Sequence, residues 1–125
     1  MEWLQYLLFG VVLFLVIQRL LPTKGLTDLS AEEVFQKLKN PKDHVFLDVR
    51  EAHEYREGHI KGFKNIPLSQ LASRQHEIDR NKSIILTCRS GMRSRQAAKI
   101  LRRNGFSRIS HLKNGVLGWH TGLNK

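Results

Sequence analysis

The chain has 125 residues, enough for one domain with a single hydrophobic core. Hydrophobic residues make up 41% of it and charged residues 26%, a balance typical of an ordered globular protein, so an intrinsically disordered chain is excluded. The single cysteine excludes an internal disulfide, and the formal net charge of +10 brings small anions, lipid headgroups and nucleic acid into question as partners.

The N-terminal segment is predicted to be a membrane anchor. None of the sixteen residues at positions 3–18 is charged, and as a helix they would cover roughly 24 Å, a little less than the hydrocarbon core of a bilayer. A cleaved signal peptide would need a positively charged start and a small-residue cleavage site, and the segment has neither. We expect a transmembrane anchor over residues 1–21, a linker over 22–25 and a folded domain over 26–125.

The charges that flank this segment predict its orientation. Glu2 precedes the uncharged stretch, whereas Arg19 and Lys24 follow it. Because positively charged flanks stay in the cytoplasm, we expect a single-pass membrane protein with its folded domain on the cytoplasmic side. A lone reactive thiol fits that reducing compartment.

The remainder of the chain alternates between helix and strand patterns. Ser30 and Glu33 have the spacing of a capping box and predict a helix over about 31–39. The predicted strands lie at 45–49, 83–87 and 109–112, and further helices at about 68–78 and 94–104. This alternation predicts an α/β fold with a mostly parallel sheet flanked by helices on both faces.

The chemistry is expected directly after the strand at 83–87, because ligands bind at the carboxyl ends of parallel strands. Cys88 stands there, followed by a short loop that enters the predicted helix. Loop N–H groups and the positive end of a helix dipole stabilise a thiolate, and arginine guanidinium groups hold oxyanions. We predict Cys88 as the nucleophile, with an anionic substrate bound by Arg89, Ser90, Gly91, Met92 and Arg93.

Three stretches together resemble the rhodanese family. They are residues 47–51 with Glu54 and Tyr55, residues 58–67, and the loop at 88–94. The resemblance covers nearly all of 26–125 and implies a rhodanese-like domain, here preceded by one N-terminal transmembrane helix. It also implies that Cys88 takes sulfur from a donor such as thiosulfate as a persulfide and passes it to a thiol or cyanide acceptor. Lys61, Phe63 and Asn114 depart from the family's usual pattern, outside the reactive loop.

The length of the loop separates this site from phosphatases of the tyrosine-phosphatase type. Four residues lie between Cys88 and Arg93, whereas the phosphatase loop has one more and forms a wider ring of donors. The shorter loop is expected to transfer sulfur and not to hydrolyse phosphate monoesters. If Arg95 took the place of Arg93, the spacing between the cysteine and the arginine would be longer, and this alternative stays open.

Asp48, Arg50 and His59 are candidates for a supporting part in the site. Asp48 and Arg50 follow a predicted strand end, where an architectural ion pair is more common than a part in chemistry. His59 lies in a turn-rich stretch, and we expect it to fix that loop by hydrogen bonding, with proton transfer as the alternative.

No metal and no cofactor are expected, since the histidines and the cysteine lack the spacing of ligands. Nucleic acid is not expected as a partner, because the basic residues of the helix at 94–104 lack interleaved aromatics; the membrane is expected instead. The alternative function is a non-catalytic, membrane-localised module for binding or redox sensing. A phosphatase or an arsenate reductase is the third reading.

Overall fold

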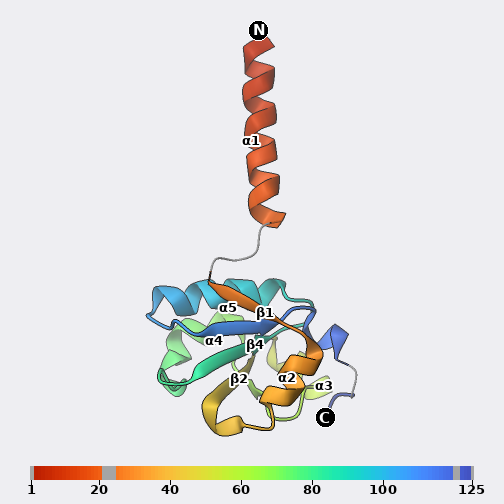
Figure 1. Ribbon diagram of the computed structural model, residues 1–125, viewed down its shortest axis with the longest axis vertical. Helices are drawn as coiled ribbons and strands as arrows, with labels where there is room; N and C mark the ends of the chain where they lie inside the picture. Colours follow the sequence, from red (N-terminus) through yellow and green to blue (C-terminus); the bar gives the residue numbers. More distant parts are fainter. Residues whose placement is uncertain (1, 21–24, 120–121, 125) are drawn as a thin grey trace.

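The computed structural model describes residues 2–20, 25–119 and 122–124, so that the predicted linker at 22–25 lies outside them except for Gly25. Five parallel strands form one sheet in the order β1-β5-β4-β2-β3 (Figure 1). The strands are β1 (Leu26–Leu29), β2 (His44–Asp48), β3 (Lys64–Asn65), β4 (Ser83–Thr87) and β5 (Ile109–Leu112). The helices are α1 (Glu2–Leu20), α2 (Ala31–Lys37), α3 (Ala52–Glu57), α4 (Leu68–Arg74) and α5 (Met92–Arg103), with short 3-10 turns η1 (Pro41–Asp43), η2 (Gln75–Glu77) and η3 (Gly115–Gly118).

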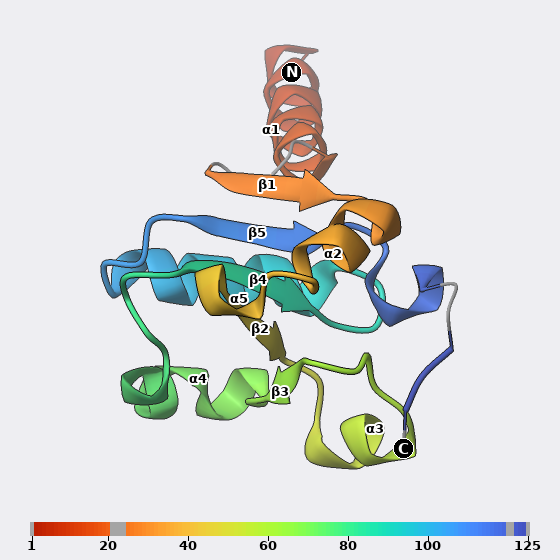
Figure 2. The same ribbon diagram turned by 60° about the horizontal axis from the view of Figure 1, so that its bottom comes forward.

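Helices cover both faces of the sheet, as the alternation of patterns predicts (Figure 2). Ile85 and Leu86 are neighbours in β4 and point to opposite faces, because successive residues of a strand alternate. Leu71 of α4 and Leu101 of α5 belong to the core on the side of Leu86. Val34 of α2 belongs to the core on the side of Ile85. The central strand is therefore buried on both faces, as its apolar sequence predicts.

The predicted elements are present, with shifted ends. The capping box forms: the Glu33 N–H donates to Ser30 Oγ at 3.1 Å, and the Ser30 N–H donates to Glu33 Oε1 at 3.2 Å. α4 is shorter than predicted because its last residues form the 3-10 turn η2. α5 begins at Met92, two residues before the predicted start at 94. β1, α3 and β3 were not predicted, since their runs of four, six and two residues are too short to show a period.

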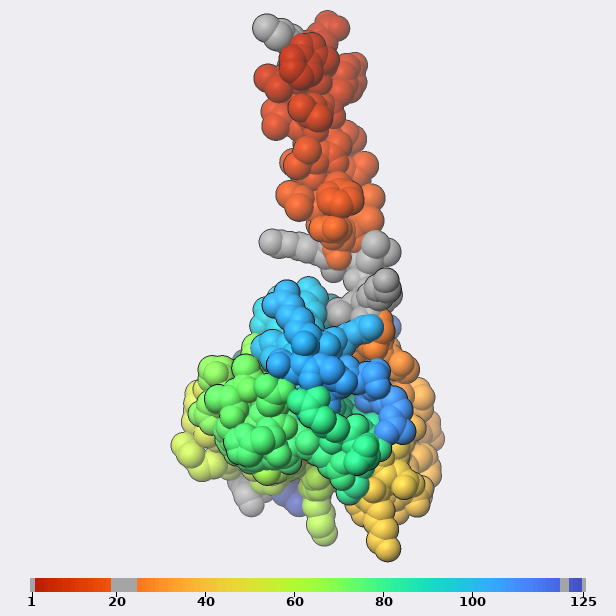
Figure 3. Space-filling model, turned by 90° about the vertical axis from the view of Figure 1, so that its left-hand side faces the viewer, coloured from red at the N-terminus to blue at the C-terminus, as the bar shows by residue number. Residues whose placement is uncertain are grey.

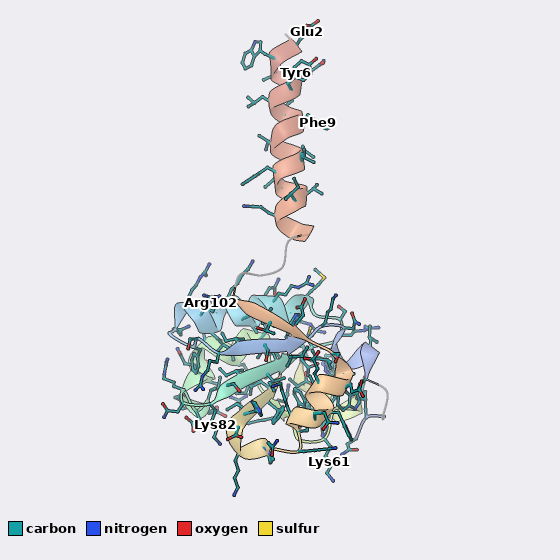
Figure 4. The ribbon with its side chains drawn as sticks, in the orientation of Figure 1. Glu2, Tyr6, Phe9, Lys61, Lys82 and Arg102 are labelled. Carbon is teal, nitrogen blue, oxygen red and sulfur yellow. The ribbon has the colours of Figure 1, made fainter. Side chains whose placement is uncertain are left out.

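The structure does not support the predicted transmembrane helix. The described side chains of α1, at positions 2–18, are all exposed, and the helix projects away from the folded domain (Figure 3). Tyr6 and Phe9 mark the apolar surface of this helix in Figure 4. These positions span about 26 Å, short of a hydrocarbon core of about 30 Å, and they include Glu2. Within the described part of the chain, no helix combines the length and the apolar character needed to cross a membrane.

The predicted orientation of the chain depends on Arg19 and Lys24. The side chains of both residues lie outside those that the structure describes. The cytoplasmic placement of the folded domain therefore stays a prediction.

Candidate functional site

The loop between β4 and α5 turns tightly around the sulfur of Cys88. Gly91, at the N-cap of α5, has a φ of +109°, a left-handed conformation that favours glycine. A Cβ there would lie 2.6 Å from the carbonyl oxygen of Lys113, so a side chain does not fit. In this conformation the Gly91 N–H donates a hydrogen bond to Cys88 Sγ at 2.9 Å. The loop thus directs a backbone donor at the sulfur.

The site lies at the N-terminal end of α5, a helix of 12 residues. The positive end of the helix dipole therefore faces the loop and favours negative charge there. Cys88 itself is buried, with 1% of its surface exposed. The side chains of Arg89, Ser90 and Met92, by contrast, are exposed. These three predicted substrate-binding residues thus have their side chains at the surface, away from the buried sulfur.

The turn η3 braces the loop from outside. The Val116 N–H donates to the Cys88 carbonyl oxygen at 2.8 Å, and the Leu117 N–H donates to the Arg89 carbonyl oxygen at 3.2 Å. Since a trans peptide places its N–H opposite its carbonyl, the N–H groups of Arg89 and Ser90 face away from η3. The brace therefore holds successive N–H groups on one side of the loop.

Gly115, at the start of η3, is expected to be sensitive to substitution. It has a φ of +60°, and a Cβ there would lie 2.4 Å from the Cys88 carbonyl oxygen. Gly115→Ala should lower the free energy of unfolding by about 2 kcal/mol or more, through backbone strain and overlap together. Gly122→Ala is the matched control, because Gly122 has a φ of +82° and open space around it. Equal losses in the two variants, measured by urea unfolding, would contradict a brace at Gly115.

Arg93 lies beside the loop and binds a carboxylate from another helix. Its Nη1 and Nη2 donate to the two oxygens of Glu54 in α3, at 2.5 and 2.9 Å. The hydrogen bond from Arg93 lowers the pKa of Glu54 to about 2. The pKa of Arg93 is raised, chiefly by the bond to Glu54 and in part by the charge of Cys88. Arg93 thus shares its charge with Glu54 at the start of α5.

A sequence profile of the rhodanese-like domain matches residues 30–121, most of the folded part of the chain. The chain belongs to this family. It is 36% identical over 114 residues to the uncharacterized protein YqhL of Bacillus subtilis. The aligned stretch covers 91% of this chain and 84% of the relative. It is 29% identical over 92 residues to a sulfurtransferase of Allochromatium vinosum, covering 74% of this chain and 86% of the relative.

Among solved structures, the domain is similar to thiosulfate sulfurtransferase from Pseudomonas aeruginosa. The two superimpose with a TM-score of 0.67 and are 31% identical, over 75% of this chain and 18% of that protein. The chain therefore contains a rhodanese-like domain, in an α/β fold with a parallel sheet between helices.

Asp48 and Arg50 form a buried ion pair in this rhodanese-like domain. Arg50 Nε donates to Asp48 Oδ1 at 3.0 Å, and Arg50 Nη2 donates to Asp48 Oδ2 at 2.7 Å. The same Nη2 donates to the Gly58 carbonyl oxygen at 2.7 Å. Asp48 is fully buried and Arg50 is 5% exposed. The pair ties the end of β2 to the end of α3, which is an architectural arrangement.

His59 has contacts that fix its loop. Its Nδ1 lies 2.9 Å from the carbonyl oxygen of Tyr55, and its ring stacks on the Tyr55 ring with centroids 3.8 Å apart. Its backbone exchanges two hydrogen bonds of 2.7 Å with Asn124. His59 thereby joins α3 to the C-terminal residues, the loop-fixing arrangement expected from the sequence, and its part in proton transfer stays an untested alternative.

Sequence reasoning missed three side chains that connect to Cys88. Cys88 Sγ lies 3.7 Å from Ser94 Oγ, and Ser94 Oγ lies 2.8 Å from Nδ1 of His111. Nε2 of His111 lies 2.6 Å from Oδ1 of Asp28. A histidine within the apolar run at 109–112 is the signal that could have pointed to this connection. That signal points to Cys88 only once β5 is known to lie next to β4 in the sheet.

Proposed function

We propose that this domain is a sulfurtransferase that carries sulfane sulfur on Cys88 as a persulfide, with thiosulfate or a related anion as the donor. The observation that carries the proposal is the 2.9 Å hydrogen bond from the Gly91 N–H to Cys88 Sγ, at the N-terminal end of α5. Negative charge on the sulfur is stabilised by that donor and by the helix dipole. A thiolate and a persulfide both carry such charge.

The proposed reaction has two steps. The Cys88 thiolate attacks the outer sulfur of thiosulfate; the bond between the two thiosulfate sulfurs breaks, and sulfite leaves with the electron pair. A thiol or cyanide acceptor then attacks the outer sulfur of the persulfide, and the electron pair of the broken bond returns to Cys88. With cyanide the product is thiocyanate, and no other oxidant or reductant is consumed.

The loop geometry also bears on the phosphatase reading. Arg95 lies within the first turn of α5, and its N–H donates to the Gly91 carbonyl oxygen at 3.2 Å. Arg93 lies in the same turn and, unlike a residue further along the helix, interacts with the charge of Cys88. Arg93 is the arginine beside the loop, and four residues separate it from Cys88. This spacing favours sulfur transfer over hydrolysis of a phosphate monoester.

The test is intact-mass spectrometry of the full chain after incubation with thiosulfate. We expect one added sulfur atom on Cys88, its removal by cyanide with formation of thiocyanate, and no hydrolysis of an aryl phosphate. A reactive thiol that gains no sulfur would favour the alternative of a non-catalytic binding or redox-sensing module. Release of phosphate from the aryl ester would favour the phosphatase reading.

Arg93 is expected to assist the binding of the anionic donor. Arg93→Ala should lower kcat/KM for thiosulfate about tenfold or more, the order expected when a charged hydrogen-bond partner is lost. Glu54→Gln is the matched variant, because it keeps the size of the side chain and removes the charge that Arg93 shares. It should leave KM for thiosulfate unchanged or lower it. Initial rates at varied thiosulfate would decide, and unchanged kinetics in Arg93→Ala would exclude Arg93 from donor binding.

A further inference from the structure

A continuous line of hydrogen-bonding groups leads from the sulfur across the sheet to its edge. Cys88 follows β4, Ser94 lies in α5, His111 in β5 and Asp28 in the edge strand β1. We propose that His111 is a positioning residue. The ring of His111 holds the Ser94 hydroxyl directed toward Nδ1, and the thiol proton of Cys88 passes to that nitrogen through the hydroxyl. The inference deepens the proposed sulfur transfer and rests on it, since it concerns how the same thiolate is formed.

The partners of the His111 ring determine its tautomer. A carboxylate can only accept, so Nε2 of His111 carries the proton that bonds Asp28 Oδ1 at 2.6 Å. In the neutral ring, Nδ1 then has a lone pair, which lies 2.8 Å from Ser94 Oγ. In the proposed arrangement the Ser94 hydroxyl donates to this lone pair, and its oxygen accepts from the thiol of Cys88 at 3.7 Å.

The Ser94 hydroxyl has a second acceptor within reach. The Gly91 carbonyl oxygen lies 2.9 Å from Ser94 Oγ. A serine has one hydroxyl proton, so His111 and the Gly91 carbonyl compete for it. Only the bond to His111 leads the proton to a basic atom. Holding the hydroxyl in that direction is the positioning role of His111.

The proton transfer needs no further reactant, because each bond that breaks is matched by one that forms. The S–H bond of Cys88 breaks as a new O–H bond forms on Ser94, while the original O–H bond of Ser94 breaks as an N–H bond forms at Nδ1 of His111. Cys88 becomes a thiolate, which receives the Gly91 N–H at 2.9 Å. His111 becomes an imidazolium, whose charge is offset by Asp28.

The surroundings of His111 favour its neutral form. The ring is fully buried, and burial lowers its pKa below the ordinary value, while the bond to Asp28 acts in the opposite direction. Among the described residues, Arg95 of α5 also acts on the ring and lowers its pKa. Cys88 is connected to the ring through the hydroxyl of Ser94. A neutral ring has the vacant Nδ1 that the transfer requires.

The experiment measures the rate at which iodoacetamide alkylates Cys88 as a function of pH, in the full chain and without any sulfur donor. In His111→Gln and in Ser94→Ala, the midpoint of the profile should rise by about one pH unit, which slows alkylation at pH 7 about tenfold. In Asp28→Ala the midpoint should rise by a smaller amount, because the imidazolium loses its counter-charge. His76→Gln, a change at an exposed histidine in η2, should leave the profile unchanged.

The outcomes separate this inference from the proposed function. His111 is buried, so His111→Gln can fail to fold; Asp28 has 39% of its side chain exposed, and Asp28→Ala then decides. A wild-type profile in folded Asp28→Ala and Ser94→Ala would overturn the relay. Shifted profiles in a protein that gains no sulfur from thiosulfate would uphold the relay and refute the sulfur transfer. Unshifted profiles in a protein that forms the persulfide would refute the relay and uphold the sulfur transfer.

Discussion

Cys88→Ser is expected to abolish sulfur transfer from thiosulfate to cyanide and to leave the fold intact. Cys88 is buried and packs within the core beneath α5, so the substitution must nearly preserve volume. A hydroxyl is close in size to a thiol, but it is not ionised at neutral pH and forms no stable sulfur adduct. Thiocyanate formation and intact mass after thiosulfate measure the loss of function, and urea unfolding measures the fold.

A second variant, Cys88→Ala, removes the polar atom altogether and should be equally inactive. It also removes the acceptor of the Gly91 N–H and the contact to Ser94. Comparison of the two unfolding curves separates the loss of the nucleophile from any loss of packing. Transfer that survives in either variant would show that Cys88 does not carry the sulfur.

Arg50→Ala is expected to cause the largest loss of stability, about 3–5 kcal/mol in the free energy of unfolding. The substitution leaves the carboxylate of Asp48 fully buried without its guanidinium partner. It also removes the donor that bonds the Gly58 carbonyl oxygen, and with it the tie between β2 and the end of α3. The measurement is urea unfolding followed by circular dichroism.

The matched control is Lys64→Ala, which breaks an exposed ion pair. Lys64 Nζ lies 2.8 Å from Glu77 Oε1, and 54% of the lysine side chain is exposed. Because solvent screens such a pair, no measurable change in unfolding is expected. If Arg50→Ala cost no more than this control, the pair of Asp48 and Arg50 would not be the structural tie described above.

Features encoded by neighbouring residues could be predicted from the sequence alone. The strand at 83–87 and the capping box at Ser30 depend on local periodicity and local hydrogen bonds, and both form as expected. The position of Cys88 also follows locally, because the residue after a parallel strand lies at the carboxyl edge of the sheet. The left-handed conformation of Gly91 was not predicted, although a glycine in a short loop before a helix is a local signal of such a turn.

The length of an apolar run can also be read from neighbouring residues. The membrane span predicted from such a run is nevertheless not supported by the structure. The described side chains of α1 cover less than a hydrocarbon core, and the uncharged run at positions 3–18 was already short by the same reckoning. The predicted anchor continues to position 21, and the side chains at positions 19–21 lie outside those that the structure describes.

Only the tertiary structure decided which distant groups meet at the sulfur. The strand order β1-β5-β4-β2-β3 places β5 between β4 and β1, and this order brings Asp28 and His111, 83 residues apart, into contact. In the same way, the tertiary fold pairs Glu54 of α3 with Arg93 of α5 across 39 residues. The sequence by itself determined the fold class and the position of the loop at Cys88, because periodicity and turn chemistry act between neighbours. It left the partners of that loop open, because they depend on strand order and helix packing, which no local pattern records.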